Sequence, residues 1–204
     1  MNKVYIQITD HCNMTCAHCC FSCSPRKKRF MTHDVFKKAL EFADCYVTIG
    51  GGEPTCHHDF WSFVGLSAGS MDIENVLVIT NGKRTNDALA LLRLCDSEVL
   101  SVELSIDDYH DQIEDRVKKR FTEHNRIRTV RNIVPSGRAK KNYLLNYNSC
   151  CFDDFFVDPV GDVFSCGCRK HKFGNVSDGI DIYKIQEWYE KHNVGFGECV
   201  FIRR

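Results

Sequence analysis

The chain has 204 residues, of which 43% are hydrophobic, and its 27 basic residues balance 27 acidic residues to a formal net charge of zero. This length fits one domain, or one domain with a small appendage, and the hydrophobic fraction is sufficient for a core. Zero net charge argues against a general electrostatic attraction to nucleic acid or to a membrane surface.

The cysteine content is high, with 13 cysteines in the chain. We find neither a signal peptide nor an apolar stretch long enough to cross a membrane, and we therefore expect a cytoplasmic protein. Outside an oxidising compartment, metal binding explains many cysteines better than a disulfide framework does. The cysteines are therefore the first candidates for functional residues.

Residues 1–9 predict a first strand, and the loop over residues 10–24 carries Cys12, Cys16 and Cys19 in the spacing C-x3-C-x2-C. Three thiolates on one loop can hold three irons of a [4Fe–4S] cluster, which leaves the fourth iron open to a ligand that is not protein. Alternatives remain at this point. The thiols can form a zinc knuckle or serve unrelated roles, and the same spacing recurs in Cys16, Cys20 and Cys23.

A second polar segment follows the second predicted strand. Thr32 is expected to cap a helix over residues 33–44, which leads into a strand over residues 45–49. This strand runs into Gly-Gly-Gly-Glu-Pro at residues 50–54. Glycines let a backbone approach a ligand closely, and Glu53 can accept a hydrogen bond from an ammonium group. A tight turn would explain the glycines, but not the Glu-Pro pair that follows them.

The alternation of strands and helices continues toward the C-terminus. We expect, in order, a helix over 58–68, a strand over 76–80, a helix opening at Asn86 or Asp87, a strand over 99–105, a helix over 107–122, a strand over 127–134 and a sixth strand over 143–147. The strands at 76–80 and 99–105 also end in polar residues, among them Asn81, Ser105 and Asp107.

This alternation predicts an α/β fold with a parallel sheet and right-handed crossovers. Barrels of this type place their sites at the carboxyl ends of the strands, where the polar segments fall. Only about twenty-five residues separate the segments near residues 107 and 134, whereas a βαβ crossover generally needs about thirty. We therefore expect a shortened, open (partial) TIM-like barrel of five or six strands, with a small C-terminal extension of a hairpin and a helix.

A second group of cysteines follows residue 147. Asp-Pro-Val-Gly-Asp at residues 158–162 lies between two apolar runs and predicts a hairpin turn, which would bring Cys151 and Cys166 together. Cys168 and Cys199 complete four thiolates, with Cys150 as an alternative to Cys151. A tetrahedral zinc site, or simple packing in the core, would also account for these cysteines. An amphipathic helix is expected over residues 181–192.

The cysteine loop, the GGEP segment, ITNG at 79–82 and SIDD at 105–108 follow one another as in the radical S-adenosylmethionine (radical SAM) superfamily, which this sequence resembles. The resemblance implies that an open iron of a [4Fe–4S] cluster chelates SAM and that an electron cleaves SAM to a 5'-deoxyadenosyl radical. The positions that match the SAM-binding residues of the family are His18, Gly51, Gly52, Glu53, Pro54, Asn81, Ser105, Asp107, Arg116 and Val134. Family members place a longer segment before the last of these, which weakens the assignment of Val134.

The spacing from Cys151 to Gly161 and Cys166 resembles the SPASM and twitch extensions of that family, which carry auxiliary [4Fe–4S] clusters. A full SPASM extension has more cysteines than this tail. The resemblance therefore implies a barrel domain over 1–147 and a twitch-like extension over 148–204, with one auxiliary cluster held by Cys151, Cys166, Cys168 and Cys199.

The functional hypothesis is a radical SAM enzyme that modifies a peptide and takes electrons from a carrier such as flavodoxin or ferredoxin. A small-molecule or nucleoside substrate, activation of a glycyl-radical enzyme, and a non-catalytic zinc or iron–sulfur adaptor are the alternatives. The basic run over 116–131 is expected to be a solvated helix face, or else to bind an acidic peptide or a phosphate. Cys45 and Cys95 are expected in the core, and Cys56, His57, His58 and Asp59 form a weaker metal candidate.

Overall fold

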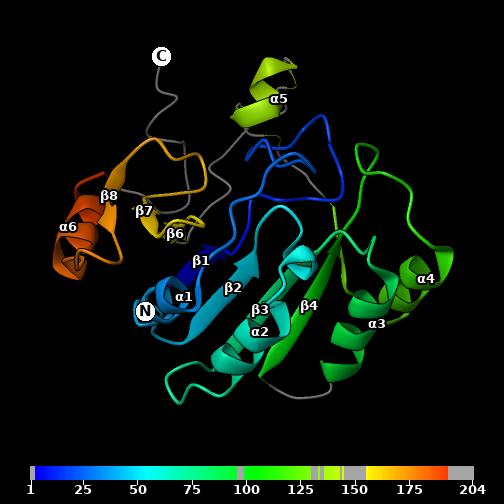
Figure 1. Ribbon diagram of the computed structural model, residues 1–204, viewed down its shortest axis with the longest axis horizontal. Coiled ribbons are helices and arrows are strands. Elements are labelled where there is room, and N and C mark those ends of the chain that lie inside the picture. The colour runs from blue at the N-terminus through cyan, green and yellow to red at the C-terminus, as the bar shows by residue number, and fades with distance from the viewer. Residues whose placement is uncertain are drawn as a thin grey trace.

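The computed structural model describes residues 3–95, 99–129, 133, 136–142, 144 and 155–192. Its centre is one eight-stranded sheet with the strand order β5-β4-β3-β2-β1-β6-β7-β8 (Figure 1). The strands are β1 (Lys3–Gln7), β2 (Tyr46–Gly50), β3 (Asn75–Thr80), β4 (Leu100–Ser105), β5 (Ile127–Arg128), β6 (Phe155–Val157), β7 (Asp162–Phe164) and β8 (Lys172–Asn175).

The strands from β5 across to β6 are parallel, and β7 and β8 are antiparallel to their neighbours. The two edge strands, β5 and β8, do not pair, so the sheet stays open. This arrangement confirms the expected α/β partial barrel. Within the described residues, the barrel part contributes the five strands β1 to β5, and a sixth parallel strand, β6, comes from the C-terminal extension.

The two faces of the sheet differ in polarity because side chains alternate along each strand. Along β4 the buried residues are Leu100, Val102 and Leu104, and the half-buried residues between them are Ser101, Glu103 and Ser105. β3 shows the same alternation. One face is therefore apolar and packs against helices, and the other is left to line a cavity.

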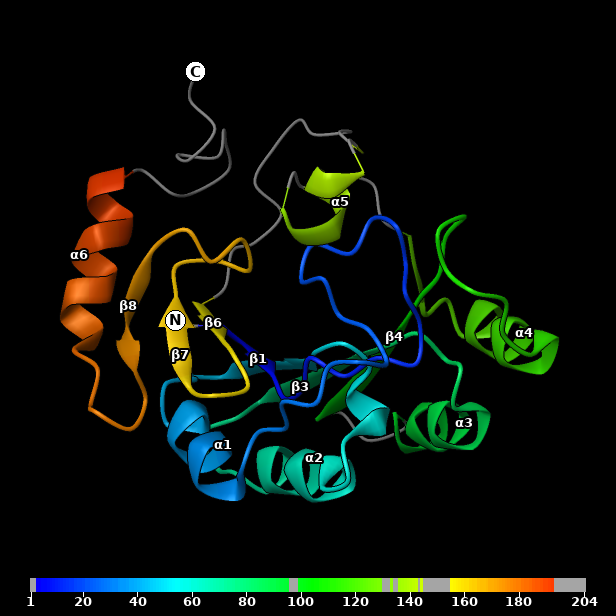
Figure 2. The same cartoon turned by 45° about the horizontal axis from the view of Figure 1, so that its top comes forward.

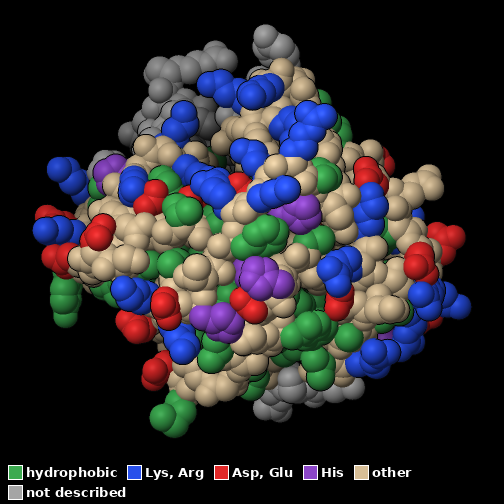
Figure 3. Space-filling model, in the orientation of Figure 1, with side chains coloured by type: hydrophobic (Ala, Val, Ile, Leu, Met, Phe, Trp, Pro, Cys, Tyr) green, Lys and Arg blue, Asp and Glu red, His purple; other side chains and the backbone are tan. Residues whose placement is uncertain are grey.

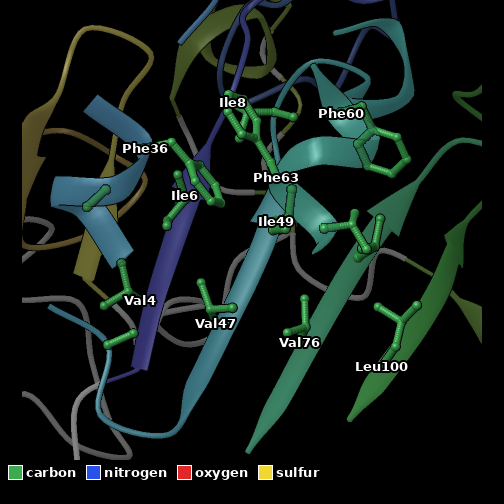
Figure 4. Close-up of a cluster of buried hydrophobic side chains, with 14 of the residues drawn as sticks. Val4, Ile6, Ile8, Phe36, Val47, Ile49, Phe60, Phe63, Val76 and Leu100 are labelled. Atoms are coloured by element: carbon green, nitrogen blue, oxygen red, sulfur yellow. The ribbon is translucent and has the colours of Figure 1, made fainter. Parts of the chain in front are cut away.

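The apolar face is covered by α1 (His33–Leu40), α2 (Phe60–Ala68), α3 (Thr85–Leu94) and α4 (Asp115–Glu123). Figure 2 shows α1, α2 and α3 together on one side of the sheet, with the cysteine-rich loop and α5 (Gly137–Lys141) on the other. In Figure 4, Phe36 of α1 and Phe63 of α2 lie next to the strands, and their rings stack with centroids 4.2 Å apart. Within the described ranges, no helix is long and apolar enough to span a membrane.

The C-terminal extension adds to the free edge of β1. β6 pairs with β1 in parallel, with Val4 opposite Phe155, and the β6–β7 hairpin turns at Asp158. The Asp158 side chain accepts hydrogen bonds from the amides of Val160 (3.0 Å) and Asp162 (3.1 Å), which confirms the predicted turn. The final helix, α6 (Ile182–His192), packs on this hairpin through the buried side chain of Ile185.

Most predicted elements are confirmed, and Thr32 does cap α1, since its hydroxyl accepts a hydrogen bond from the Val35 amide (3.3 Å). The prediction of a helix from residue 107 was wrong, because α4 begins only at Asp115. The Asp107 carboxylate accepts hydrogen bonds from the Tyr109 amide and from the His110 ring (both 2.9 Å), and such local bonds compete with a helix.

Other boundaries differ from those expected. α1 ends at Leu40 instead of residue 44, and α3 begins at Thr85, before the predicted start. Of the predicted strand over 127–134, the structure forms Ile127–Arg128, and most of the remainder lies outside the described residues. Apart from Leu144, the predicted sixth strand at 143–147 also lies outside them.

Candidate active site

A cavity of about 560 Å³ lies on the inner face of the sheet. Inward-facing strand residues such as Thr48 and Ile79 form its floor, while the cysteine-rich loop and the polar segments after β2, β3 and β4 surround its carboxyl end. Of the sequence-predicted site residues, it brings together Cys12, Cys16, His18, Cys19, Gly51, Gly52, Glu53, Asn81 and Ser105. The structure therefore gathers these candidate residues at the carboxyl edge of the sheet.

The cysteine-rich loop is closed at its base by bonds between its two ends. The amide of Cys12 donates to the carbonyl of Ser24 (3.2 Å). Just outside this pair, the Asp10 carboxylate accepts from both the amide (2.9 Å) and the Nε (2.7 Å) of Arg29. Residues 13–23 consequently project as one loop over the end of the barrel. Within this loop, the side chains of Met14 and Cys23 are buried.

The thiols of this loop differ in their electrostatic environment. Burial raises the pKa of Cys12 to about 12 and that of Cys16 to about 11. Hydrogen bonding to Cys23 lowers the pKa of Cys19 to about 6, against the effect of burial. The amide of Cys23 donates to Cys19 Sγ at 3.4 Å. Desolvated thiolates near one another are unfavourable without a cation, so this set of donors suits a metal cluster.

The contacts of Cys12 favour the first of the two possible cysteine registers. Asn81 Nδ2 donates to Cys12 Sγ (3.7 Å) and to the side-chain carbonyl of Asn13 (2.9 Å). Gly52 lies against the same cysteine, because a Cβ added there would be 2.9 Å from Cys12 Cβ. The polar segments after β2 and β3 thus both contact Cys12, which belongs to the first register and not to the second.

The two loops at the ends of β1 and β2 are held together by backbone contacts. The amide of Gly52 donates to the carbonyl of Thr9 (2.8 Å), and the amide of Glu53 donates to that of His11 (2.9 Å). A Cβ on Gly52 would lie only 2.1 Å from the His11 carbonyl oxygen. Glycine is therefore required here by close backbone approach, which supports the interpretation of the segment as more than a turn.

Glu53 is a buried carboxylate with a network of donors. Its Oε1 accepts from the hydroxyls of Thr55 (2.6 Å) and Thr80 (2.7 Å), and its Oε2 accepts from the amide of Asn81 (2.7 Å). Burial raises its pKa, while the donors counteract that rise. Pro54 is buried at the start of the 3-10 turn Pro54–Cys56 that follows. A buried carboxylate on a cavity wall favours a cationic ligand group.

His18 and Asp107 carry buried polar atoms that lack partners. Among the described residues, His18 Nδ1 and Asp107 Oδ2 make no hydrogen bond, although His18 Nε2 lies 3.6 Å from Asp107 Oδ2. Burial lowers the pKa of His18. Leaving such a group unsatisfied costs about 1–3 kcal/mol, so a ligand that supplies a donor would recover stability at this wall.

Arg116 does not reach the cavity. It lies on α4, its side chain is largely exposed, and its Nε donates to Glu114 (2.6 Å). Arg128, which sequence reasoning missed, lines the cavity from β5 and stands opposite Ser105 in the β4–β5 register. Its signals in the sequence were its position in a predicted strand that follows the SIDD segment and its place in the basic run over 116–131. Val134 lies outside the described residues.

Arg138 is a second residue that the sequence analysis did not single out. It lines the cavity and contacts the cysteine-rich loop from α5, with Nε on the carbonyl of Cys16 and Nη2 on that of Cys23 (both 2.8 Å). Its signal in the sequence was its place in Pro-Ser-Gly-Arg at residues 135–138, directly after Val134.

Of the predicted auxiliary site, the structure describes Cys166 and Cys168, while Cys150, Cys151 and Cys199 lie outside the described residues. Cys166 is buried, and hydrogen bonding to Cys168 lowers its pKa to about 6. The turn that carries them connects to the barrel, because Arg169 hydrogen-bonds to Gln7 and Gln7 Nε2 donates to Cys23 Sγ (3.4 Å).

The histidines near residue 57 have structural roles. Figure 3 shows histidine side chains gathered near the centre of one face. His57 Nε2 donates to the carbonyl of Met31 (3.0 Å), and its Nδ1 accepts from the amide of Asp59 (3.0 Å). Burial lowers the pKa of His57 to about 4. Both ring nitrogens are used within the fold, so we assign this residue no metal.

The described fold is an open parallel βα barrel with a cysteine-rich loop at its carboxyl edge. The family model of the Radical SAM superfamily matches residues 6–146, which is more than half of the chain. The chain belongs to the Radical SAM superfamily.

Individual relatives are distant. The chain is 27% identical over 193 residues to the mycofactocin maturase MftC of Mycobacterium ulcerans, a match that covers 91% of this chain and 50% of the relative. It is 24% identical to the GTP 3',8-cyclase of Clostridium perfringens over 173 residues, covering 80% of this chain and 51% of the cyclase. The chain therefore spans about half the length of these curated relatives.

Solved structures show the same fold. BtrN in complex with AdoMet and 2-DOIA is similar with a TM-score of 0.63 at 18% identity, covering 91% of this chain and 83% of that one. Native anSMEcpe with bound AdoMet and the Cp18Cys peptide gives a TM-score of 0.58 at 16% identity, covering 95% and 82%.

We expect Gly52→Ala to disrupt the site, because its Cβ would collide with the His11 carbonyl. The cost should be about 1–3 kcal/mol of stability or more, with loss of metal bound by the cysteine-rich loop. Gly65→Ala is the matched control, since nothing lies within 4 Å of its Cβ and alanine is preferred in a helix by up to about 1 kcal/mol. Urea denaturation would measure the stability of each variant, and elemental analysis would measure its iron content. Equal iron content in the two variants would contradict the expectation.

Proposed function

We propose that this chain is a radical SAM enzyme that binds a [4Fe–4S] cluster through Cys12, Cys16 and Cys19. The single observation that carries the proposal is the convergence of two different sites. Cys12 of the cysteine-rich loop contacts Gly52 and Asn81, which flank and hydrogen-bond the buried carboxylate of Glu53. A zinc adaptor would use the thiols, but it would have no use for a desolvated carboxylate beside them.

The residues of the cavity fit both groups that the proposal requires, a [4Fe–4S] cluster and SAM. Desolvated thiols suit a cluster, and the unpartnered Nδ1 of His18, which lines the same cavity, suits a further ligand there. When bound, the cluster would supply the electron that cleaves SAM to a 5'-deoxyadenosyl radical. Glu53 would hold the amino group of SAM, and Gly51 and Gly52 would let it approach the backbone.

The remaining SAM contacts come from the ends of β4 and β5. Ser105 and Arg128 stand opposite one another on the cavity wall, and the cationic Arg128 is placed to attract the carboxylate of SAM. We therefore propose Arg128, in place of the exposed Arg116, for that role. His18 and Asp107 would contact the nucleoside end.

A peptide is the proposed substrate. The sheet is open, so the cavity is reached from the side without a closed barrel wall. Support comes from the similar fold of anSMEcpe, which was solved with a bound peptide, and from the match to a maturase. A small molecule is the second candidate, because BtrN and the GTP cyclase carry small-molecule ligands or substrates in their names. Flavodoxin or ferredoxin would provide electrons.

We further propose a second [4Fe–4S] cluster in the extension, with Cys166 and Cys168 as two of its ligands and Cys151, or Cys150, and Cys199 as the others. The hydrogen bond between the thiols of Cys166 and Cys168 supports this, because it places two candidate ligands side by side. A zinc ion on the same cysteines is the competing assignment.

Cys16→Ala should abolish SAM cleavage, since one of three cluster ligands is lost. The assay is 5'-deoxyadenosine release by protein reconstituted anaerobically with iron and sulfide and reduced with dithionite. Cys45→Ala, on a half-buried cysteine outside the cavity, should retain the activity. Equal release by the Cys16 variant and the wild type would refute the proposed function.

Glu53→Gln should weaken SAM binding about 10- to 100-fold, because a hydrogen bond to a charged group contributes about 1.5–3 kcal/mol. Calorimetric titration of the reconstituted protein with SAM measures this affinity. Glu41→Gln removes an exposed carboxylate and should leave it unchanged. Unaltered affinity in a folded Glu53 variant would exclude Glu53 as the amine-binding residue.

Cys168→Ala should lower the iron content from about eight to about four atoms per chain if the extension holds a four-iron cluster. Cys95→Ala, on a cysteine packed against the core, is the control. Elemental analysis after reconstitution provides the count. Four irons with one zinc in the wild type, and loss of the zinc in the variant, would assign zinc to the extension instead.

A further inference from the structure

Helix α5 is attached to the cysteine-rich loop through a series of backbone carbonyls. The amide of Arg138 donates to the carbonyl of Cys19 (2.9 Å), and its Nε and Nη2 donate to those of Cys16 and Cys23 (both 2.8 Å). Asn142 Nδ2 adds a bond to Ala17 (3.0 Å). One arginine thus fixes the backbone at three cysteines of the loop.

The close fit of α5 shows that this contact is specific. Gly137 has a φ of +54°, and a Cβ on it would lie 2.2 Å from the carbonyl oxygen of Cys20. Glycine at this position lets the helix start against the loop and places the next residue, Arg138, over its carbonyls. Carbonyl oxygens that face a planar guanidinium are matched by its fixed set of donors, which an ammonium group does not reproduce.

Arg138 also acts on a thiol through the backbone. It holds the carbonyl of Cys23, and the amide of the same residue donates to Cys19 Sγ at 3.4 Å. Partners of this kind, one step removed from the ligands, orient metal ligands and tune the metal. The guanidinium donates to the backbone carbonyl of one proposed cluster ligand, Cys16, and its positive charge helps to lower the pKa of the thiol of another, Cys19.

We propose that Arg138 is the positioning residue of the catalytic cluster. Its two-pronged bond to Cys16 and Cys23 fixes the loop, and its charge stabilises the more negative, reduced form of the cluster. This inference rests on the proposed function. It assigns two separable effects to one side chain, one that depends on the shape of the guanidinium and one that depends on its charge.

Three variants separate the two effects. Arg138→Lys keeps the charge but loses the planar fork, and Arg138→Gln loses both. Lys140→Gln, an exposed residue of the same helix, removes a charge without touching the loop. Each reconstituted protein is assayed for iron release to a chelator and for the reduced fraction of its cluster, measured by electron paramagnetic resonance at fixed potentials.

For Arg138→Gln we expect about tenfold faster iron release and about a tenfold lower ratio of reduced to oxidised cluster, which equals 59 mV for a one-electron couple. Arg138→Lys should release iron faster but keep the wild-type potential. Lys140→Gln should match the wild type in both. Circular dichroism of each protein confirms that the variants are folded.

Two results would overturn the inference. If both Arg138 variants match Lys140→Gln in iron release and in potential, Arg138 has no role at the cluster. If Arg138→Lys and Arg138→Gln shift the potential equally, the role of its charge is refuted. A wild-type loop that takes up zinc instead of iron would overturn the proposed function and the redox role of Arg138, while metal release would still report on its positioning role.

Discussion

Everything in this molecule depends on the alternation of side chains along the parallel strands. Because neighbouring residues point to opposite faces, β3 and β4 present Val76, Val78, Val102 and similar residues to the helices, and Leu77, Ile79 and Ser105 to the cavity. The same alternation that builds a core on one face of the sheet leaves side chains on the other face to line the cavity. The openness of the sheet keeps that inner face accessible, since β5 and β8 do not pair to close it.

Several buried polar groups lie close together at the carboxyl edge of this sheet, and their burial is unfavourable in the absence of a ligand. Glu53 is fully desolvated, Cys12 and Cys16 are thiols whose pKa is raised by burial, and His18 and Asp107 hold polar atoms without partners among the described residues. A stable fold tolerates the free-energy cost of burying such groups at a site where a bound ligand offsets that cost. Apart from Asp107, all of these groups line one cavity, and this shared location is stronger support for cofactor binding than any one motif.

The sequence predicted the parts of the site that local patterns determine. The cysteine-rich loop follows β1, and the Gly-Gly-Glu segment follows β2, because short polar runs directly after apolar strands fall at one edge of a parallel sheet. The fold class followed from the same alternation. The antiparallel hairpin of the extension was also readable, because the turn chemistry around Asp158 is local.

What could not be predicted depends on contacts between distant segments. The Asp107 side chain prevents a helix from starting there, which leaves Arg116 at the surface, while β5 places Arg128 beside Ser105. Arg138 is separated from Cys16, whose carbonyl it holds, by 122 positions in the sequence. Nor did any pattern indicate that β6 would pair with β1, because a three-residue strand carries no signal for its partner.

Because β6 pairs with β1, the extension supports the candidate site and is not an independent appendage. β1 leads directly into the cysteine-rich loop, so the strand that begins that loop is flanked on one side by β2 and on the other by the extension. Arg169, stacked over the rings of Phe156 and Phe21, hydrogen-bonds to Gln7, and Gln7 in turn donates to Cys23. Among the described residues, these contacts connect the turn that carries Cys166 and Cys168 to Cys23 of the cysteine-rich loop.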